Sequence, residues 1–274
     1  MLLQRVLTAL VLAPLMLAGI YLLSPPLFSV FIGVIVMIAA WEWFNLAGYS
    51  RMLMRWVFVT LSALVLLGLW WLAEQSSLSW TYLTIAALLW WVLALVLVLT
   101  YPGSQSLIAQ PGVRLMLFVP VMVPLWLGLN LIKARPDATL MLTWLMLLVW
   151  GADIGAYFAG RAFGRRKLAP NVSPGKTWAG VYGGMATSML ISTGLAMLFI
   201  PALSAVQWLL LLLFSALVVA ISVLGDLVES LLKRLRGIKD SSSLLPGHGG
   251  VLDRVDSLCA ATPMFVLMLV LVAL

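Results

Sequence analysis

The sequence contains few charged residues. Asp, Glu, Lys and Arg together make up 9% of its 274 residues, whereas hydrophobic residues make up 64%. Soluble domains contain about 25% charged residues, so this composition excludes an ordinary soluble domain. The single cysteine, Cys259, excludes an internal disulfide and a cysteine-ligated metal cluster. We expect this thiol to be buried and inert.

Long apolar runs dominate the chain. A membrane-spanning helix needs about 20 predominantly apolar residues. The first run follows Arg5 as in a signal peptide, but it lacks a small-residue cleavage site, and Pro25-Pro26 leads directly into the next run. We therefore interpret it as a membrane helix. The chain is predicted to be an all-α, polytopic integral membrane protein with about nine transmembrane helices, near residues 6–23, 27–47, 54–73, 80–100, 112–132, 139–160, 177–200, 207–225 and 257–274.

Lysine and arginine are unevenly distributed among the connecting loops. If the N-terminus lies in the cytoplasm and the C-terminus outside, only Lys133 and Arg135 of the 16 basic residues fall outside. Cytoplasmic loops of membrane proteins carry such an excess, so the distribution predicts this orientation. The net charge of +7 then reflects cytoplasmic loops and contact with anionic lipid rather than nucleic acid.

Acidic residues concentrate near the C-terminus. The segment 226–256 holds more than half of the nine in the chain: Asp226, Glu229, Asp240, Asp253 and Asp256. Another, Asp153, lies within the sixth predicted helix, and ionisable groups at membrane depth usually mark functional sites. We therefore divide the chain into N-terminal transmembrane helices, 1–110, and a transmembrane catalytic region, 111–274, with cytoplasmic loops 161–176 and 226–256.

The segment 223–236 has a helical pattern with two interpretations. Asp226, Glu229, Ser230 and Lys233 share one face because they are spaced i, i+3, i+4 and i+7. Such a face is typical of an active-site wall, but also of a solvated helix on which Glu229 pairs with Lys233. Spacing alone leaves both interpretations open.

A glycine-rich segment follows this helix. Lys239-Asp240 precedes Leu245–Gly250, where three glycines flank His248, the only histidine. Glycines let backbone N–H groups approach phosphate oxygens closely. Asp253 and Asp256 come next at i, i+3, and Mg²⁺ usually binds one or two carboxylates together with substrate phosphates. The segment therefore predicts a site that handles phosphate and magnesium.

A second polar cluster occupies residues 151–178. Small residues at positions 151, 152, 155, 156 and 159 allow close helix packing around Asp153. Residues 173–177 end like a P-loop, but the first glycine is missing and we expect no preceding strand, which excludes that motif. Lys167 and Lys176 suit phosphate contacts, although cytoplasmic placement alone also accounts for their charge.

These segments together resemble the phosphatidate cytidylyltransferase (CDP-diacylglycerol synthase) family. Its signature is matched by Ser230–Arg234, Lys239-Asp240, Leu245–Gly250 and Asp253–Asp256. The segments Gly151–Asp153, Lys167–Pro170, Ser173–Trp178, Trp41–Trp43 and Tyr101–Gly103 are also similar to bacterial members. The resemblance covers most of the chain and is sharpest from residue 150 to residue 257.

The resemblance implies a reaction and its location. Members transfer the CMP group of CTP to phosphatidic acid, giving CDP-diacylglycerol and pyrophosphate for phospholipid synthesis. The implied partners are CTP, phosphatidic acid, the lipid bilayer and a second copy of the chain, without nucleic acid. The implied location is the bacterial inner membrane, with the active site facing the cytoplasm. The implied cofactor is Mg²⁺, which K⁺ can accompany, held by Asp226 and Asp253.

The site residues follow from the signature and the charge pattern. We expect catalytic roles for Asp226, Asp253, Lys167, Lys176 and Lys239, with Asp256 and Asp153 as second choices. We expect substrate contacts from Ser173, Lys176, Lys233, Arg234, His248, Gly249, Gly250 and Arg254. For His248, a role in shaping its loop is equally consistent with the sequence.

Other functions remain to be weighed against this one. A polyprenol kinase or a cytidylyltransferase for another lipid would share much of the signature, which does not determine the lipid. A transporter or channel would use Asp153 and Asp226 as ion-coupling residues. That function would leave the glycine-rich segment and its lysines unexplained. The spaced aspartate motif of CDP-alcohol phosphotransferases is absent from the sequence.

Overall fold

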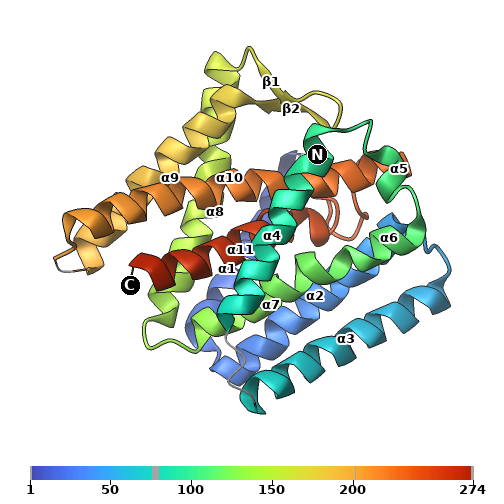
Figure 1. Cartoon of the computed structure of the whole chain (residues 1–274), viewed down its shortest axis with the longest axis horizontal. Helices are drawn as coiled ribbons and strands as arrows, with labels where there is room; N and C mark the ends of the chain where they lie inside the picture. The colour runs from blue at the N-terminus through green and yellow to red at the C-terminus, as the bar shows by residue number, and fades with distance from the viewer. Residues whose placement is uncertain (1, 76–79, 201, 273–274) are drawn as a thin grey trace.

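The computed structural model describes residues 2–75, 80–200 and 202–272, and it is almost entirely helical (Figure 1). The helices are α1 (Leu2–Leu22), α2 (Pro25–Ala47), α3 (Met52–Gln75), α4 (Trp80–Leu99), α5 (Gln105–Ile108), α6 (Pro111–Met116), α7 (Phe118–Lys133), α8 (Ala138–Phe163), α9 (Trp178–Phe199), α10 (Ala205–Arg236) and α11 (Leu252–Val272). A short antiparallel hairpin, β1 (Lys167–Ala169) and β2 (Ser173–Thr177), connects α8 to α9.

The helices agree with the predicted polytopic membrane fold. Within the described residues, seven helical segments are long and apolar enough to cross a membrane, with α6 and α7 together forming one of them. Two shorter apolar helices, Val6–Leu22 and Thr84–Leu99, coincide with the first and fourth predicted spans. The all-α membrane fold is therefore confirmed, whereas the number of spans and the sides of the termini stay predictions.

Helix packing buries the large side chains between the helices and leaves apolar side chains on the outside. Trp43, Trp144 and Phe265 are fully buried, and so is Cys259, as expected. Leu22 and Leu198, in contrast, are more than 70% exposed. An apolar outer surface is what a bilayer requires, because lipid tails replace water as the solvent.

Glycines bring two helix pairs into close contact. A Cβ at Gly155 of α8 would overlap Thr187 Oγ1 of α9, and a Cβ at Gly183 would overlap Ala159. This contact confirms the close packing predicted around Asp153. In α10, a Cβ at Gly225 would overlap the backbone carbonyl of Asp256. Such small-residue contacts let helix backbones approach closely.

Two helices extend further than the predicted spans. α10 continues beyond residue 225 to Arg236, because no glycine or proline lies between Gly225 and Gly237, which ends the helix at φ 69°. Its last turn contains Lys233, Arg234 and Arg236, whose positive charge complements the helix dipole. α11 begins at Leu252 rather than at the predicted residue 257. Both extensions carry the polar residues of the signature into regular helix.

The hairpin corrects one expectation from the sequence. A strand, β1, does precede residues 173–177, although none was expected. Residues 173–177 are themselves β2, paired with β1 so that Lys167 lies opposite Thr177. Thr177 then caps α9, since its Oγ1 accepts a hydrogen bond from Gly180 N at 3.2 Å. The segment is therefore an arm of a hairpin, which agrees with excluding a P-loop.

Candidate active site

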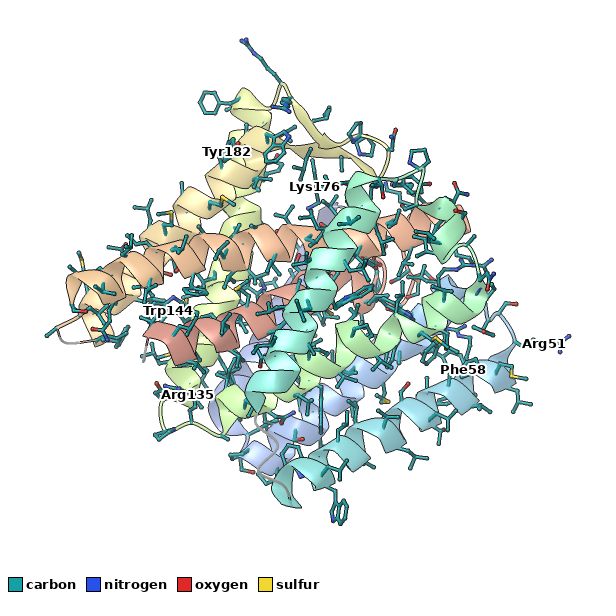
Figure 2. The ribbon with its side chains drawn as sticks, in the orientation of Figure 1. Arg51, Phe58, Arg135, Trp144, Lys176 and Tyr182 are labelled. Atoms are coloured by element: carbon teal, nitrogen blue, oxygen red, sulfur yellow. The ribbon has the colours of Figure 1, made fainter. Side chains whose placement is uncertain are left out.

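An ion pair joins the hairpin to α10. Lys176 Nζ of β2 lies 2.8 Å from Asp226 Oδ2, and both side chains are about one-third exposed or less. Burial disfavours the Lys176 ammonium, but the carboxylates of Asp226, Asp256 and Asp153 favour it more strongly, so its pKa lies above the ordinary value. Figure 2 shows Lys176 on the hairpin, in the upper part of the view. Lys176 therefore stays charged at neutral pH and lies among carboxylates.

A cavity of about 390 Å³ opens beside this ion pair. Its lining comes from α8, the hairpin, α9 and α10, and includes Asp153, Tyr157, Arg161, Lys176 and Thr177. Both cationic and anionic groups therefore face the same space. Ligand sites typically combine a mainly apolar wall with a few polar groups placed in this way.

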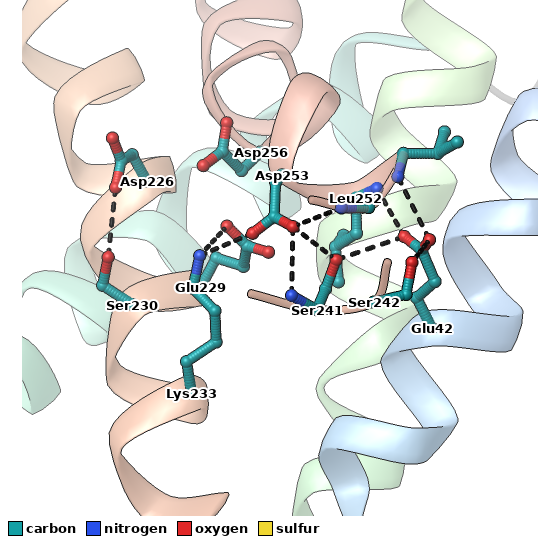
Figure 3. Close-up of polar contacts among 12 residues, drawn as sticks. Glu42, Asp226, Glu229, Ser230, Lys233, Ser241, Ser242, Leu252, Asp253 and Asp256 are labelled. Carbon is teal, nitrogen blue, oxygen red and sulfur yellow. Dashed lines mark hydrogen bonds and ion pairs between the residues drawn. The ribbon is translucent and has the colours of Figure 1, made fainter. Parts of the chain in front are cut away.

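A lysine bridges α10 and α11 next to this region. Lys233 Nζ lies 3.0 Å from Glu229 Oε2 and 2.7 Å from Asp253 Oδ1 (Figure 3). Glu229 is 2% exposed, so its carboxylate depends on this ammonium for charge compensation. The Glu229–Lys233 pairing that the spacing allowed on a solvated helix face is present, but the face is buried: the two side chains are only 2% and 12% exposed.

Asp253 is held by its own loop on the other side. Its Oδ2 accepts hydrogen bonds from Ser241 N at 3.0 Å, Ser241 Oγ at 2.7 Å and Gly250 N at 2.7 Å (Figure 3). Its side chain is only 6% exposed. Lys233 and these donors together determine the orientation of the Asp253 carboxylate.

The glycines of the signature loop serve the packing around Asp253. Gly249 adopts φ +80°, a conformation that favours glycine, and a Cβ there would lie 2.6 Å from Asp253 Oδ2. A Cβ at Gly250 would overlap Ser241 Oγ and the Glu42 carboxylate. Because Gly250 N donates to Asp253, the predicted phosphate contact of this N–H competes with an internal hydrogen bond. The predicted substrate contacts of Gly249 and Gly250 stay predictions.

A carboxylate from the N-terminal part of the chain also reaches this loop. Glu42 of α2 is 1% exposed, and it accepts hydrogen bonds from Ser241, Ser242, Val251 and Leu252. Sequence reasoning singled out only the Trp41-Glu42-Trp43 tripeptide as part of a resemblance and gave Glu42 no role. An acidic residue within an apolar membrane helix usually has a functional role, and this feature could have pointed to Glu42.

The other predicted residues lie around these contacts. Asp256 extends from α11 towards Asp226 and Glu229 (Figure 3). Its Oδ1 accepts a hydrogen bond from Ser257 N at 2.6 Å. Arg234 Nε donates to Val172 O at 3.0 Å and thereby ties α10 to the hairpin. Ser173 and His248 are half-buried, whereas Lys167, Lys239 and Arg254 are exposed. His248 N donates to Leu245 O at 2.9 Å within the loop.

The carboxylates of the site retain acceptor capacity for a metal ion. Asp226 Oδ1 accepts one hydrogen bond, from Ser230, and Asp253 Oδ1 contacts Lys233. Each carboxylate oxygen offers about two lone-pair sites. No group of three or more His, Cys, Asp or Glu side chains in the described part of the chain is arranged to hold a metal. The donor chemistry thus fits Mg²⁺ shared with substrate phosphates, which needs only one or two carboxylates.

Comparison with known proteins identifies relatives along the whole chain. The model of a family described as the cytidylyltransferase family matches residues 3–272. The phosphatidate cytidylyltransferase of Pseudomonas aeruginosa is 49% identical over 269 residues, which cover 98% of this chain and 97% of the relative. The phosphatidate cytidylyltransferase of Haemophilus influenzae is 41% identical over 285 residues, covering 97% of each chain.

Proposed function

Because the chain belongs to the cytidylyltransferase family and is a membrane nucleotidyltransferase, we propose that it transfers the CMP group of CTP to phosphatidate. The products are CDP-diacylglycerol and pyrophosphate. The observation that carries this proposal is the 49% identity to a relative of that name across 98% of the chain. The mixed-charge cavity beside Lys176 and Asp226 supports it, because both substrates carry phosphate groups.

The reaction needs no nucleophile from the protein. A phosphate oxygen of phosphatidate attacks the α-phosphorus of CTP and forms the new P–O bond. The bond from the α-phosphorus to the oxygen bridging to the β-phosphorus breaks, and pyrophosphate leaves with that electron pair. Catalysis then depends on positioning and on compensating phosphate charge, as in other phosphoryl-group transfers.

Lys176 and Arg161 line the cavity and supply positive charge for the phosphates. Asp226 holds Lys176 in place through the 2.8 Å ion pair. Lys167, Lys239 and Arg254 are exposed, and we expect them to contact the phosphates, as the sequence predicts. Asp226 and Asp253 would hold Mg²⁺, which would supply positive charge to the phosphates. Lys233 compensates the charge of Glu229 and Asp253, and so acts on substrate through Asp253.

We place the protein in the bacterial inner membrane, with the site facing the cytoplasm. CTP is soluble and cytoplasmic, whereas phosphatidate stays in the bilayer, so the site must be reached from both. The excess of lysine and arginine in segments 161–176 and 226–256 supports this orientation. The proposed assembly is a homodimer, on the basis of the family resemblance alone.

The test is turnover by the purified protein in detergent with CTP, Mg²⁺ and phosphatidate. We expect pyrophosphate and CDP-diacylglycerol in equal amounts, and no turnover after chelation of Mg²⁺. Turnover only with a polyprenol or another lipid phosphate would replace the lipid substrate. A folded protein that is silent with every lipid phosphate would overturn the proposed function. Transport by reconstituted vesicles would then be measured instead.

A further inference from the structure

Glu42 is a buried carboxylate that the proposed reaction does not use directly. It lies near the C-terminal end of α2, between Trp41 and Trp43, and is 1% exposed. Burying a charged group is costly unless hydrogen bonds or opposite charges compensate it. A carboxylate retained at such a position therefore needs an explanation in its contacts.

The contacts of Glu42 all come from the signature loop and the start of α11. Oε1 accepts hydrogen bonds from Ser242 Oγ at 2.5 Å and from Val251 N at 3.1 Å. Oε2 accepts from Leu252 N at 2.7 Å and from Ser241 Oγ at 3.3 Å. These donors are about 200 positions away in the sequence.

No ion pair among the described residues includes Glu42. Four donors and the positive end of the α11 dipole compensate its charge, together with the positive charge of Arg55, which interacts with Glu42 without forming an ion pair. The same contacts satisfy two backbone N–H groups at the first turn of α11, which has no internal partners for them. Glu42 thus acts as the cap of a helix that belongs to a distant part of the chain.

This cap is connected directly to Asp253. Ser241 Oγ lies 2.7 Å from Asp253 Oδ2 and 3.3 Å from Glu42 Oε2, so one hydroxyl bridges the two carboxylates (Figure 3). Leu252, whose N–H Glu42 holds, is the residue next to Asp253. Gly250 is packed against Ser241 and Glu42 and also donates to Asp253. Glu42 therefore restrains both segments that orient Asp253.

We propose that Glu42 is a positioning residue for the transfer reaction: it holds residues 241–252 so that Asp253 keeps its orientation towards the substrates. This inference rests on the proposed function for the role of Asp253. Glu42 itself touches neither substrate, because its acceptor oxygens are occupied by the loop. Its effect passes through Ser241 and the first turn of α11.

The test compares Glu42→Gln with the unmodified protein in the turnover assay with CTP and phosphatidate. The amide keeps the shape of the side chain, but its NH₂ group opposes N–H donors that the carboxylate accepted. We expect kcat to fall by about 10²-fold, the loss that a displacement of about 1 Å produces. The KM for phosphatidate should stay unchanged, and Glu42→Asp should recover part of the kcat.

A matched control separates this effect from the loss of any carboxylate. Asp137→Asn removes the charge of a residue in the loop between α7 and α8, paired with Arg135 and outside the site. It should keep the kcat of the unmodified protein. A folded Glu42→Gln protein with that same kcat would overturn the proposal. Ser242→Ala, which removes a single donor, tests the same contact with a smaller expected loss if Glu42→Gln fails to fold.

Hydrogen exchange gives a readout that does not depend on activity. In Glu42→Gln, the amides of Val251 and Leu252 should exchange faster, while amides in the middle of α10 should not change. Unchanged exchange at both positions would contradict the positioning role, whatever the activity. If the unmodified protein lacks turnover but the exchange result holds, the proposed function fails and the contact of Glu42 with the loop remains established.

Discussion

The two carboxylates assigned to the reaction lie in different surroundings. Asp226 faces Lys176 beside an open cavity, and its side chain is 33% exposed. Asp253 is 6% exposed and accepts three hydrogen bonds from its own loop in addition to its contact with Lys233. Lys176 and Asp226 can exchange partners when a substrate enters. In contrast, one oxygen of Asp253 already accepts three hydrogen bonds. The Asp226 side is thus suited to bind phosphate, and the Asp253 side to stay rigid.

This contrast also separates the lysines. Lys176 lines the cavity and contacts a single carboxylate, so a phosphate can approach it. Lys233 lies between Glu229 and Asp253, with only 12% of its side chain exposed. Two lysines that were both predicted to contact substrate therefore lie in different surroundings. Substitutions on the two sides should accordingly affect activity and stability in different proportions.

Substitution of Asp226, beside the open cavity, should cause the largest loss of activity. Asp226→Asn removes the charge that holds Lys176 and one proposed metal carboxylate. We expect turnover to fall by about 10²–10³-fold, as when a transition-state electrostatic contact is removed. Because this ion pair is partly exposed, the free energy of unfolding should change by less than about 1 kcal/mol. Turnover assays and thermal unfolding in detergent check both expectations. A large loss of stability would contradict the assignment of Asp226 to an adaptable region.

Substitution of the bridging lysine should mainly reduce stability. Lys233→Met leaves Glu229 and Asp253 without their cation in a buried site. Removing one partner of such a group destabilises proteins by about 3–5 kcal/mol. The free energy of unfolding in detergent and denaturant is the measurement. Stability equal to that of the unmodified protein would show that the Asp253 side is not dependent on this charge.

A methyl group added to the signature loop beside Asp253 tests the packing of that loop. In Gly250→Ala, the new Cβ overlaps Ser241 Oγ and the Glu42 carboxylate. Overpacking of this kind costs about 1–3 kcal/mol, so the unfolding midpoint should fall. Gly175→Ala on the hairpin is the matched control, because nothing lies within 4 Å of its added Cβ. Equal stability of the two variants would contradict the tight packing of the signature loop.

The smallest effect is expected far from both regions. Figure 2 shows Arg135 at a distance from Lys176, and its side chain pairs with Asp137 at 2.8 Å. The hydrogen bond from Arg135 lowers the pKa of Asp137. A lowered pKa means that the pair stabilises the fold above about pH 4, the ordinary range of aspartate, and less as the pH falls below it.

Since both side chains are about one-third exposed, this contribution should stay below about 1 kcal/mol. The difference in unfolding free energy between the unmodified protein and Asp137→Asn measures it. That difference should be present at neutral pH and vanish in acid. A difference that grows in acid would contradict stabilisation by the ionised Asp137.

Much of the fold could be predicted because membrane helices depend on local composition. Within the described residues, each predicted span coincides with a helix or, for 112–132, with the two consecutive helices α6 and α7, since about 20 apolar residues must satisfy their backbone hydrogen bonds within the segment. The ends were less predictable. α10 continues to Arg236 because its termination depends on Gly237, not on where hydrophobicity falls.

The site was predicted in part. The Glu229–Lys233 pairing follows from i, i+4 spacing within one helix, and the structure contains it. The pairing of Lys176 with Asp226 joins residues 50 positions apart, and no spacing rule connects a strand to a helix at that distance. The roles assigned to the site residues stay predictions until the variants are measured.

The sequence by itself determined the membrane fold and the segments that carry charge, because hydrophobicity, helix spacing and the signature residues are local properties. Only the tertiary structure decided which charges from different segments meet. Glu42 lies in the predicted N-terminal region, 1–110, yet its four donors belong to the predicted catalytic region. A buried carboxylate must find donors wherever the packing brings them, and packing brings together segments that local sequence does not relate.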